Sequence, residues 1–218
     1  MTRDEAVALI KQQMTFRTTL DSEIVTNLKA AQVLVEQEPY KPWFLVAEDS
    51  YTTTEAEEQR IEIPEDFLEE VDEAVLRYVP FDPTTEDPER DLKKDQYDVL
   101  RKNYMDPDTG TIETGPPEAY CLMGNYFRLF PTPDDEYRIQ MIYYQKDDEL
   151  DTNIENQWLK YCPYLLMGIA GRMIANAVRD PTALAQFREW ERDGRAVLMR
   201  NVHSREMTGM ELQVGGPH

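Results

Sequence analysis

Histidine and cysteine are scarce in this sequence, with two of each among 218 residues. His203 and His218 both lie near the end of the chain, so a histidine-based metal site or a Ser-His dyad has almost no material. The glycine-rich loops that hold nucleotide phosphates are missing as well. Cys121 and Cys162 are too few for a disulfide framework, and we expect both to be free, buried thiols. The sequence therefore predicts no cofactor, no metal site and no enzymatic activity.

Long hydrophobic runs and an excess of basic residues are also lacking. The most apolar run, residues 164–170, is followed by Arg172 and is far shorter than the roughly 20 residues that span a bilayer. The first residues lead directly into a helical pattern, so we expect neither a signal peptide nor a membrane association. With 41% hydrophobic residues, the chain is too apolar to be intrinsically disordered.

Acidic residues outnumber basic ones by 43 to 23, which gives a formal net charge of −20. Binding to nucleic acid depends on Lys and Arg side chains that neutralise phosphates, so this charge argues against a protein that grips DNA or RNA. The same charge also fits a role in solubility alone.

Three acidic segments are candidates for a divalent cation. Residues 106–110 are similar to the start of a calcium loop, but the glycine comes one position early and Pro117 stands where a glutamate is needed. We therefore interpret them as an exposed turn. Residues 134–136 and 147–149 flank the last expected strand, and we interpret them as solvated ends of a hairpin rather than as cation ligands.

Helical patterns occupy both ends of the chain. Thr2 and Glu5 form a capping box at the first helix, and Gly168, Ala170, Gly171 and Ala175 would allow a neighbouring helix to approach closely. The expected helices span residues 3–13, 21–38, 164–178 and 181–201, the last two as an antiparallel hairpin. They predict a bundle built from residues 1–40 and 150–201, followed by a mobile tail at 202–218.

Residues 116–146 have the clearest strand pattern. Over residues 137–144 the spacing has a period of two, which directs successive side chains to opposite faces of a strand. A tight turn is expected at Gly124-Asn125, and Pro131 and Pro133 are expected to reverse the direction of the chain. This pattern predicts a three-stranded antiparallel meander. Strands are expected near residues 43–47, 60–63, 119–123, 125–131 and 137–146.

The remaining segments of the insertion are assigned less regular elements. Residues 65–70 are expected to form a short helix, residues 71–79 favour a strand over a helix, and residues 89–103 are expected to form a third helix. The predicted fold class is α+β. It is mainly an α-helical bundle formed by the N- and C-terminal helices, with a small antiparallel β element inserted at residues 41–149.

Aromatic residues are concentrated in the predicted meander. Because no Lys or Arg residues alternate with them, they favour a core or a protein interface over base stacking. A three-stranded meander with aromatics on both faces has more apolar surface than one face can bury. The aromatics that we expect to contact a neighbouring subunit are Tyr126, Phe127, Tyr143 and Tyr144.

Several short motifs follow the N-terminal helices and the Trp-Phe segment. They are Ile63-Pro64-Glu65-Asp66-Phe67, Pro117-Glu118-Ala119-Tyr120, Arg128-Leu129-Phe130-Pro131-Thr132-Pro133, Tyr137-Arg138-Ile139 and Ile142-Tyr143-Tyr144. C-terminal helices follow them, with Asn153 as an expected cap and with Pro163 and Asp180-Pro181 at helix starts. This order over about residues 20–198 resembles the head-to-tail adaptor proteins of tailed bacteriophages.

The resemblance implies a ring, commonly of twelve copies, between the portal and the tail. The implied partners are the portal protein, a tail or nozzle protein and other copies of the chain, with double-stranded DNA passing through without specific binding. The implied location is the virion neck, after synthesis in the host cytoplasm. In this family the C-terminal segment often docks onto the portal, so the contact residues that the resemblance implies are Arg200, Arg205, Met207, Met210 and Leu212.

Two alternatives from other classes remain at this point. An acidic soluble regulator or DNA mimic would occupy a basic groove, but it needs carboxylates gathered on one surface, and here they are spread over the whole chain. A carboxylate-based hydrolase would use a pair such as Asp134 and Asp148 as acid and base, but no motif supports it.

Overall fold

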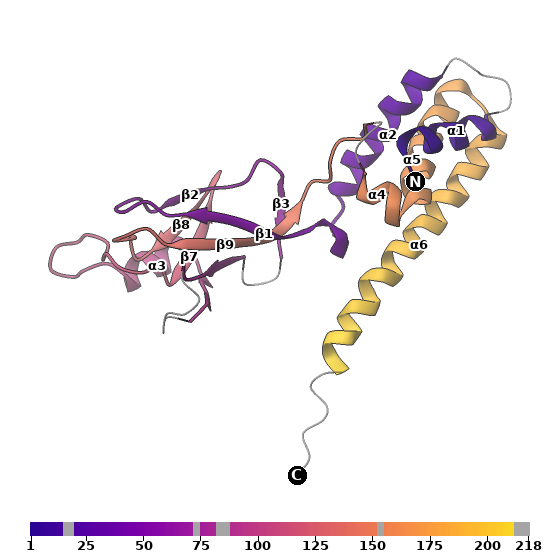
Figure 1. The fold of residues 1–218 in the computed structure, drawn as a ribbon. Coiled ribbons are helices and arrows are strands. Elements are labelled where there is room, and N and C mark those ends of the chain that lie inside the picture. Colours follow the sequence, from indigo (N-terminus) through magenta and orange to yellow (C-terminus); the bar gives the residue numbers. More distant parts are fainter. Residues whose placement is uncertain (15–19, 72–74, 82–87, 152–154, 212–218) are drawn as a thin grey trace, which may run out of the picture. The chain divides into compact units, whose positions relative to one another are not determined.

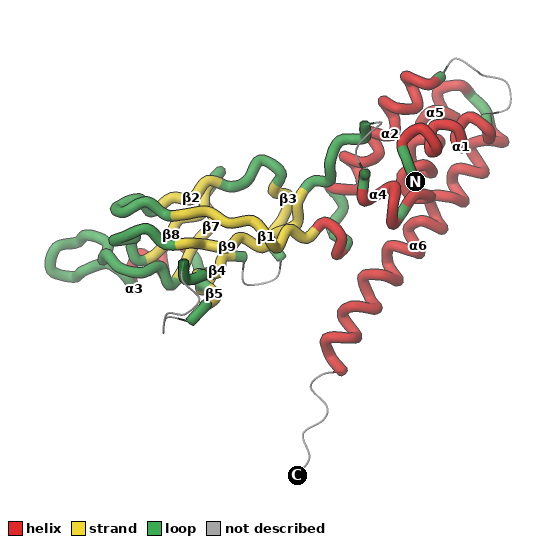
Figure 2. Tube along the Cα trace, viewed as in Figure 1, coloured by secondary structure: helices red, strands yellow, loops and turns green. Residues whose placement is uncertain are grey.

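The fold is known from a computed structural model that describes residues 1–14, 20–71, 75–81, 88–151 and 155–211, with side-chain surroundings up to residue 200. The chain forms two compact units (Figure 1). The helical unit consists of Met1–Leu45 and Lys146–His218, and the β unit consists of Val46–Gln145. Helices dominate the first unit and strands the second (Figure 2).

The helical unit is organised around one buried helix. Its helices are α1 (Arg3–Gln13), α2 (Asp21–Glu36), the 3-10 turn η1 (Trp43–Leu45), α4 (Gln157–Tyr161), α5 (Pro163–Val178) and α6 (Pro181–Glu211). α5 contacts α1, α2, α4 and α6, and most of its residues from Leu165 to Ala175 are buried. On α2, the expected stripe of Ile24, Leu28, Ala31 and Val35 is fully buried.

The first helix, α1, begins with the hydrogen bonds expected from the sequence. The Thr2 hydroxyl accepts a hydrogen bond from the Glu5 backbone N–H at 3.2 Å, and the Glu5 carboxylate accepts one from the Thr2 N–H at 2.8 Å. The predicted capping box is therefore confirmed. At the C-terminal end the prediction is wrong, because α6 continues through Glu211 instead of ending at residue 201. Of the expected tail, residues 212–218 are not described.

α5 and α6 approach so closely that glycine is required at their contacts. A Cβ added to Gly168 would lie 2.4 Å from the backbone nitrogen of Glu191, and one added to Gly194 would lie 2.3 Å from that of Leu165. As α5 advances from Leu165 to Gly168, its partner in α6 retreats from Gly194 to Glu191. The predicted antiparallel hairpin with small residues at its contact is confirmed.

The β unit contains two sheets. Its strands are β1 (Val46–Thr53), β2 (Arg60–Glu62), β3 (Phe67–Glu70), β4 (Leu76–Tyr78), β5 (Arg90–Asp91), β6 (Lys93–Lys94), β7 (Ala119–Met123), β8 (Tyr126–Phe130) and β9 (Arg138–Gln145), and its helix is α3 (Tyr97–Asn103). The first sheet has the order β1-β9-β4-β5, with β3 also paired to β9, and the second has the order β2-β8-β7-β6. All pairings are antiparallel except that of β6 with β7.

The two sheets share a core. One buried cluster includes Ile139 and Met141 of the first sheet together with Tyr120, Phe127 and Leu129 of the second. The opposite face of the second sheet packs on α3 through a smaller cluster of Leu100, Ala119, Cys121 and Phe130. Alternate residues of β7 thus serve two cores, as expected for a strand whose side chains point to opposite faces.

The predicted three-stranded meander is wrong. β7 and β8 form a hairpin, but β9 leaves it and becomes the central strand of the other sheet, where β1 lies on one side and β3 and β4 lie on the other. Between them, the chain is held at Thr132, whose backbone N–H donates to the Glu113 carbonyl and whose carbonyl accepts from Gly115. These contacts direct the chain away from β8 before β9 begins.

The prediction of a mainly helical bundle is also wrong, because the chain has about 43% helix and 24% strand in two multi-stranded sheets. The strand expected at residues 43–47 is a 3-10 turn followed by β1. The helix expected at 65–70 is β3, and the helix expected at 89–103 is β5, β6 and the shorter α3. These strands have two to four residues, too few to show a period of two.

We predict that Gly168→Ala lowers the free energy of unfolding of the helical unit by about 3 kcal/mol, because the added methyl meets backbone that cannot move aside without separating α5 from α6. Ala177→Ser adds one heavy atom at an exposed position of the same helix and should change it by less than about 0.5 kcal/mol. Chemical denaturation followed by circular dichroism measures both. Equal effects of the two substitutions would contradict the close contact.

Candidate functional site

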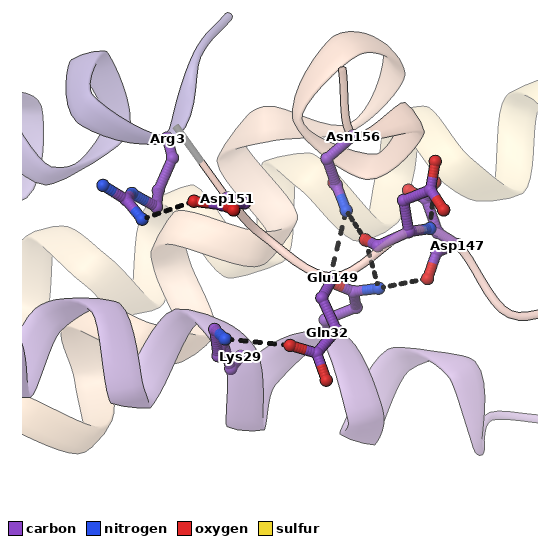
Figure 3. Close-up of polar contacts among 8 residues, drawn as sticks. Arg3, Lys29, Gln32, Asp147, Glu149, Asp151 and Asn156 are labelled. Atoms are coloured by element: carbon purple, nitrogen blue, oxygen red, sulfur yellow. Dashed lines mark hydrogen bonds and ion pairs between the residues drawn. The ribbon is translucent and has the colours of Figure 1, made fainter. Parts of the chain in front are cut away.

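The segment after β9 is attached to α2 by a buried polar network (Figure 3). The Gln32 side-chain amide donates to the backbone carbonyls of Asp147 at 3.1 Å and Asp148 at 3.2 Å, and to the Glu36 carboxylate at 3.0 Å. The Asn156 amide donates to the Gln32 side-chain oxygen at 3.2 Å and to the Asp148 carbonyl at 2.9 Å. Gln32 is 6% exposed and Asn156 is 2% exposed, so their hydrogen bonds replace lost contacts with water.

Asn156 also begins the short helix α4. Its side-chain oxygen accepts a hydrogen bond from the Leu159 backbone N–H at 3.0 Å, which makes it the N-cap of the helix. Asn153, the cap expected from the sequence, lies outside the described residues. One side chain thus joins the cap of α4, the returning backbone and α2.

Asp147 is the ionisable centre of this network. Its carboxylate accepts hydrogen bonds from the backbone N–H groups of Trp158 at 3.0 Å and Asp148 at 2.9 Å, and its own N–H donates to Glu36 at 3.1 Å. Burial raises the pKa of Asp147 to about 6; the backbone N–H donors lower this pKa, and the nearby Glu36 raises it.

Two ion pairs lie at the solvent side of the same segment. Lys29 contacts Glu149 at 3.0 Å, and Arg3 contacts Asp151 at 3.5 Å. Exposed ion pairs of this kind contribute little to stability, but these two join the same segment to the N-terminal helices α1 and α2, of which the buried network contacts α2. Residues 147–149 therefore attach the returning chain to α2, and Asp151 attaches it to α1. Residues 147–149 do not end a β8–β9 hairpin, as the sequence had suggested.

The other acidic candidates are engaged locally. The Asp106 carboxylate accepts hydrogen bonds from the Asp108 N–H at 2.8 Å and the Thr109 hydroxyl at 2.9 Å, which lower its pKa and close a turn. Asp134 accepts a hydrogen bond from the Tyr137 hydroxyl at 2.5 Å. Asp134 and Asp148, the hypothetical hydrolase pair, belong to different units. Within the ranges given above, no three His, Cys, Asp or Glu side chains are grouped to hold a metal ion.

The two cysteines are free and buried, as predicted. Burial raises the pKa of Cys162 to about 11, so this thiol is protonated at neutral pH and is a poor nucleophile. No helix in the described part of the chain is long and apolar enough to cross a membrane.

A model of one protein family, described as SU10 adaptor protein, matches residues 1–210. The chain belongs to the SU10 adaptor protein family. The resemblance to phage adaptors that the motifs indicated is confirmed, and the match runs through both units. The adaptor is a structural bacteriophage protein and a virion component, and its family is not a class of enzymes. No curated protein matches it.

The aromatics expected at a subunit contact fall into two groups. Phe127 is 0% exposed and Tyr143 is 3% exposed, and both belong to the shared core of the two sheets. This burial places both side chains inside the adaptor's own fold. Tyr126 and Tyr144 are half-buried and retain accessible surface. Tyr126 lies under the Arg60 guanidinium, 4.8 Å from its ring centre.

Four of the five residues expected to contact the portal lie in the C-terminal part of α6. Arg200 is exposed on α6, and Arg205, Met207 and Met210 lie within the span of the same helix. Leu212 lies outside the described residues.

The charge of the adaptor is not spread evenly, contrary to the expectation from the sequence. Residues 46–145 contain 26 acidic and 9 basic residues, a formal net charge of −17, whereas the helical unit contains 17 acidic and 14 basic residues, a net charge of −3. The sequence analysis already placed an insertion at residues 41–149, close to the observed Val46–Gln145, so a charge count on each side of those bounds was the signal that it missed. It also missed the Gln32 network, although a glutamine on the apolar stripe of α2 was a usable signal.

We predict that Asp147 makes the adaptor relatively more stable at acidic pH. Folding raises the pKa from the ordinary value of 3.8 to about 6, so between these values the folded chain holds a proton that the unfolded chain has released. The stabilisation is complete below about pH 4 and is lost as pH rises through 6. Relative to Asp147→Asn, wild type should gain about 1 kcal/mol between pH 7.5 and pH 4.5, after discounting for solvent screening. Denaturation at both values checks this; an unchanged difference would contradict the assignment.

Proposed function

We propose that the adaptor forms a homo-oligomeric ring at the neck of the virion, between the portal and the tail or nozzle, and that DNA passes through this ring. The observation that carries the proposal is the family match over residues 1–210, because it includes the helical unit, the β unit and nearly all of α6. Ring formation, its copy number and the identity of both neighbours are the proposed extensions of that membership.

The charge of the adaptor supports a passage that does not hold DNA. A net charge of −20 repels phosphates, and even the helical unit has no excess of basic residues. A ring of such subunits would let a duplex slide without the salt-dependent contacts of a DNA-binding protein. The alternative of an acidic regulator or DNA mimic is not needed to explain the chain, because membership of the adaptor family already gives it a structural role.

The length of α6 supports a contact beyond the helical unit. α6 has 31 residues and its antiparallel partner α5 has 16, which corresponds to about 46 and 24 Å of helix. The C-terminal half of α6 therefore extends past the end of α5. We propose that this half, with Arg200, Arg205, Met207 and Met210, and the following Leu212, docks onto the portal.

We predict that the purified adaptor mixed with purified portal rings gives a complex whose mass corresponds to one closed ring of adaptor copies on each portal. Native mass spectrometry measures the copy number, and deletion of residues 200–218 should remove binding without unfolding α5. An adaptor that stays monomeric and never joins the portal would contradict the proposal.

We also predict that Tyr144→Asp lowers the yield of closed rings at least about fivefold while the β unit stays folded, because Tyr144 is half-buried and is proposed to face a neighbouring subunit. Tyr143→Asp is the matched comparison: it places a charge in the shared core and should unfold the β unit. Ring yield is read by native mass and folding by circular dichroism. Normal rings from Tyr144→Asp would remove this residue from the proposed contact.

A further inference from the structure

The second sheet of the β unit has an open edge at β2. The Gln59 carbonyl accepts from Leu129 and the Ile63 N–H donates to Asn125, so residues 59, 61 and 63 direct their backbone groups towards β8. In an antiparallel ladder the intervening residues direct theirs the other way. The backbone N–H and carbonyl groups of Arg60 and Glu62 therefore point away from β8, at the unpaired edge of the sheet. The Arg60 N–H is taken by the Glu58 carboxylate at 3.1 Å, whereas the structure records no partner for the Glu62 N–H among the described residues.

A second edge lines the same space. The Thr54 N–H donates to the Tyr137 carbonyl, so by the same alternation Thr52 faces β9 and Thr53 directs its backbone groups outward. A groove of about 750 Å³ lies between the end of β1 and the whole of β2, with Asn125 and Tyr126 at the β7–β8 turn as part of its wall. The groove lies entirely within the β unit. Its lining includes all of β2 together with Glu58 before the strand and Ile63 after it.

The charge around this groove identifies the kind of segment that fits. Glu55, Glu58 and Glu62 line it and are exposed, and Arg60 is the one basic residue in its lining. The Arg60 guanidinium is turned onto the Tyr126 ring at 4.8 Å. The surrounding unit has a net charge of −17. An acidic segment would be repelled and a neutral one would gain no charge attraction, whereas alternating Lys or Arg side chains would meet carboxylates.

We propose that the β2 edge is a docking site for an extended, basic segment of another virion protein. The segment pairs with the backbone N–H and carbonyl of Glu62, adds a fifth strand beside β2 in the second sheet, and sets its basic side chains against Glu55, Glu58 and Glu62. Backbone pairing supplies the geometry, and charge selects the partner. The site does not depend on the portal contact or on ring closure, so its test and theirs fail separately.

The test uses the full chain and a fluorescent octapeptide of alternating Lys with Val or Thr, at about 20 mM salt, where surface charges are weakly screened. Fluorescence anisotropy measures the dissociation constant. The variant Glu55→Gln, Glu58→Gln, Glu62→Gln should weaken binding at least about tenfold. A matched variant, Asp98→Asn, Asp108→Asn, Glu113→Gln, removes the same charge from exposed positions outside the groove and should weaken it less than about twofold.

The backbone part of the proposal has its own variant. Glu62→Pro removes the outward N–H and leaves the hydrogen bonds of residues 59, 61 and 63 to β8 intact. It should weaken binding more than Glu62→Gln, which removes only the charge. A Lys-Pro octapeptide has the same charge but few backbone donors and should bind at least about tenfold more weakly. In wild type, the peptide should slow hydrogen exchange of the Glu62 amide at least about tenfold, which tests the pairing even if Glu62→Pro unfolds.

Three results would overturn the proposal. Equal losses from the two triple variants would show a diffuse attraction to the acidic unit. Unchanged exchange at Glu62 in the saturated complex would show that no strand is added. Protection of Glu62 that grows with protein concentration and without peptide would identify a second copy of the chain as the occupant.

Discussion

The pairing of β1 with β9 is the constraint on which both units depend. The helical unit is interrupted by 100 residues, between Leu45 and Lys146, and closing a loop of that length costs on the order of 4 kcal/mol. Val46 pairs directly with Tyr144, so the folded β unit holds its own entry and exit about 5 Å apart. The returning chain is then held to α2 by the hydrogen bonds among Gln32, Glu36, Asp147 and Asn156. α5 follows and packs against α2 in the core of the helical unit. Each unit has its own core, and the folded β unit adds little loop-closure entropy to the cost of folding the helical unit.

This arrangement separates two physical roles within the adaptor. The helical unit has a nearly balanced charge, a close glycine-lined contact between α5 and α6, and a helix that continues past its partner. The β unit has most of the net charge and an open strand edge. We infer that the first suits assembly with a defined neighbour, whereas the second suits a partner chosen by charge. Neither role needs a nucleophile or a metal.

The sequence predicted those features that depend on neighbouring residues. The capping box at Thr2, the buried stripe of α2, the α5–α6 hairpin and the alternation of β9 follow from local chemistry and periodicity, and the motif order led to the correct family. It failed where pairing is non-local. β9 was placed beside β8 because they are adjacent in sequence. The strand expected within residues 71–79 is confirmed as β4, but β3, β5 and β6 were missed because their stability comes from partners elsewhere along the chain. The Gln32 network required the same long-range information, because its partners Asp147, Asp148 and Asn156 lie more than 100 residues away in the sequence.

The most direct test of the proposed adaptor role is a cryo-electron microscopy reconstruction of the phage particle that contains this chain. We expect identical copies of the helical unit in one closed ring around the DNA path, with α6 directed at the portal and the acidic β units in contact with other virion proteins. A particle in which the chain is absent from the neck, or in which its copies do not encircle the DNA, would contradict the account.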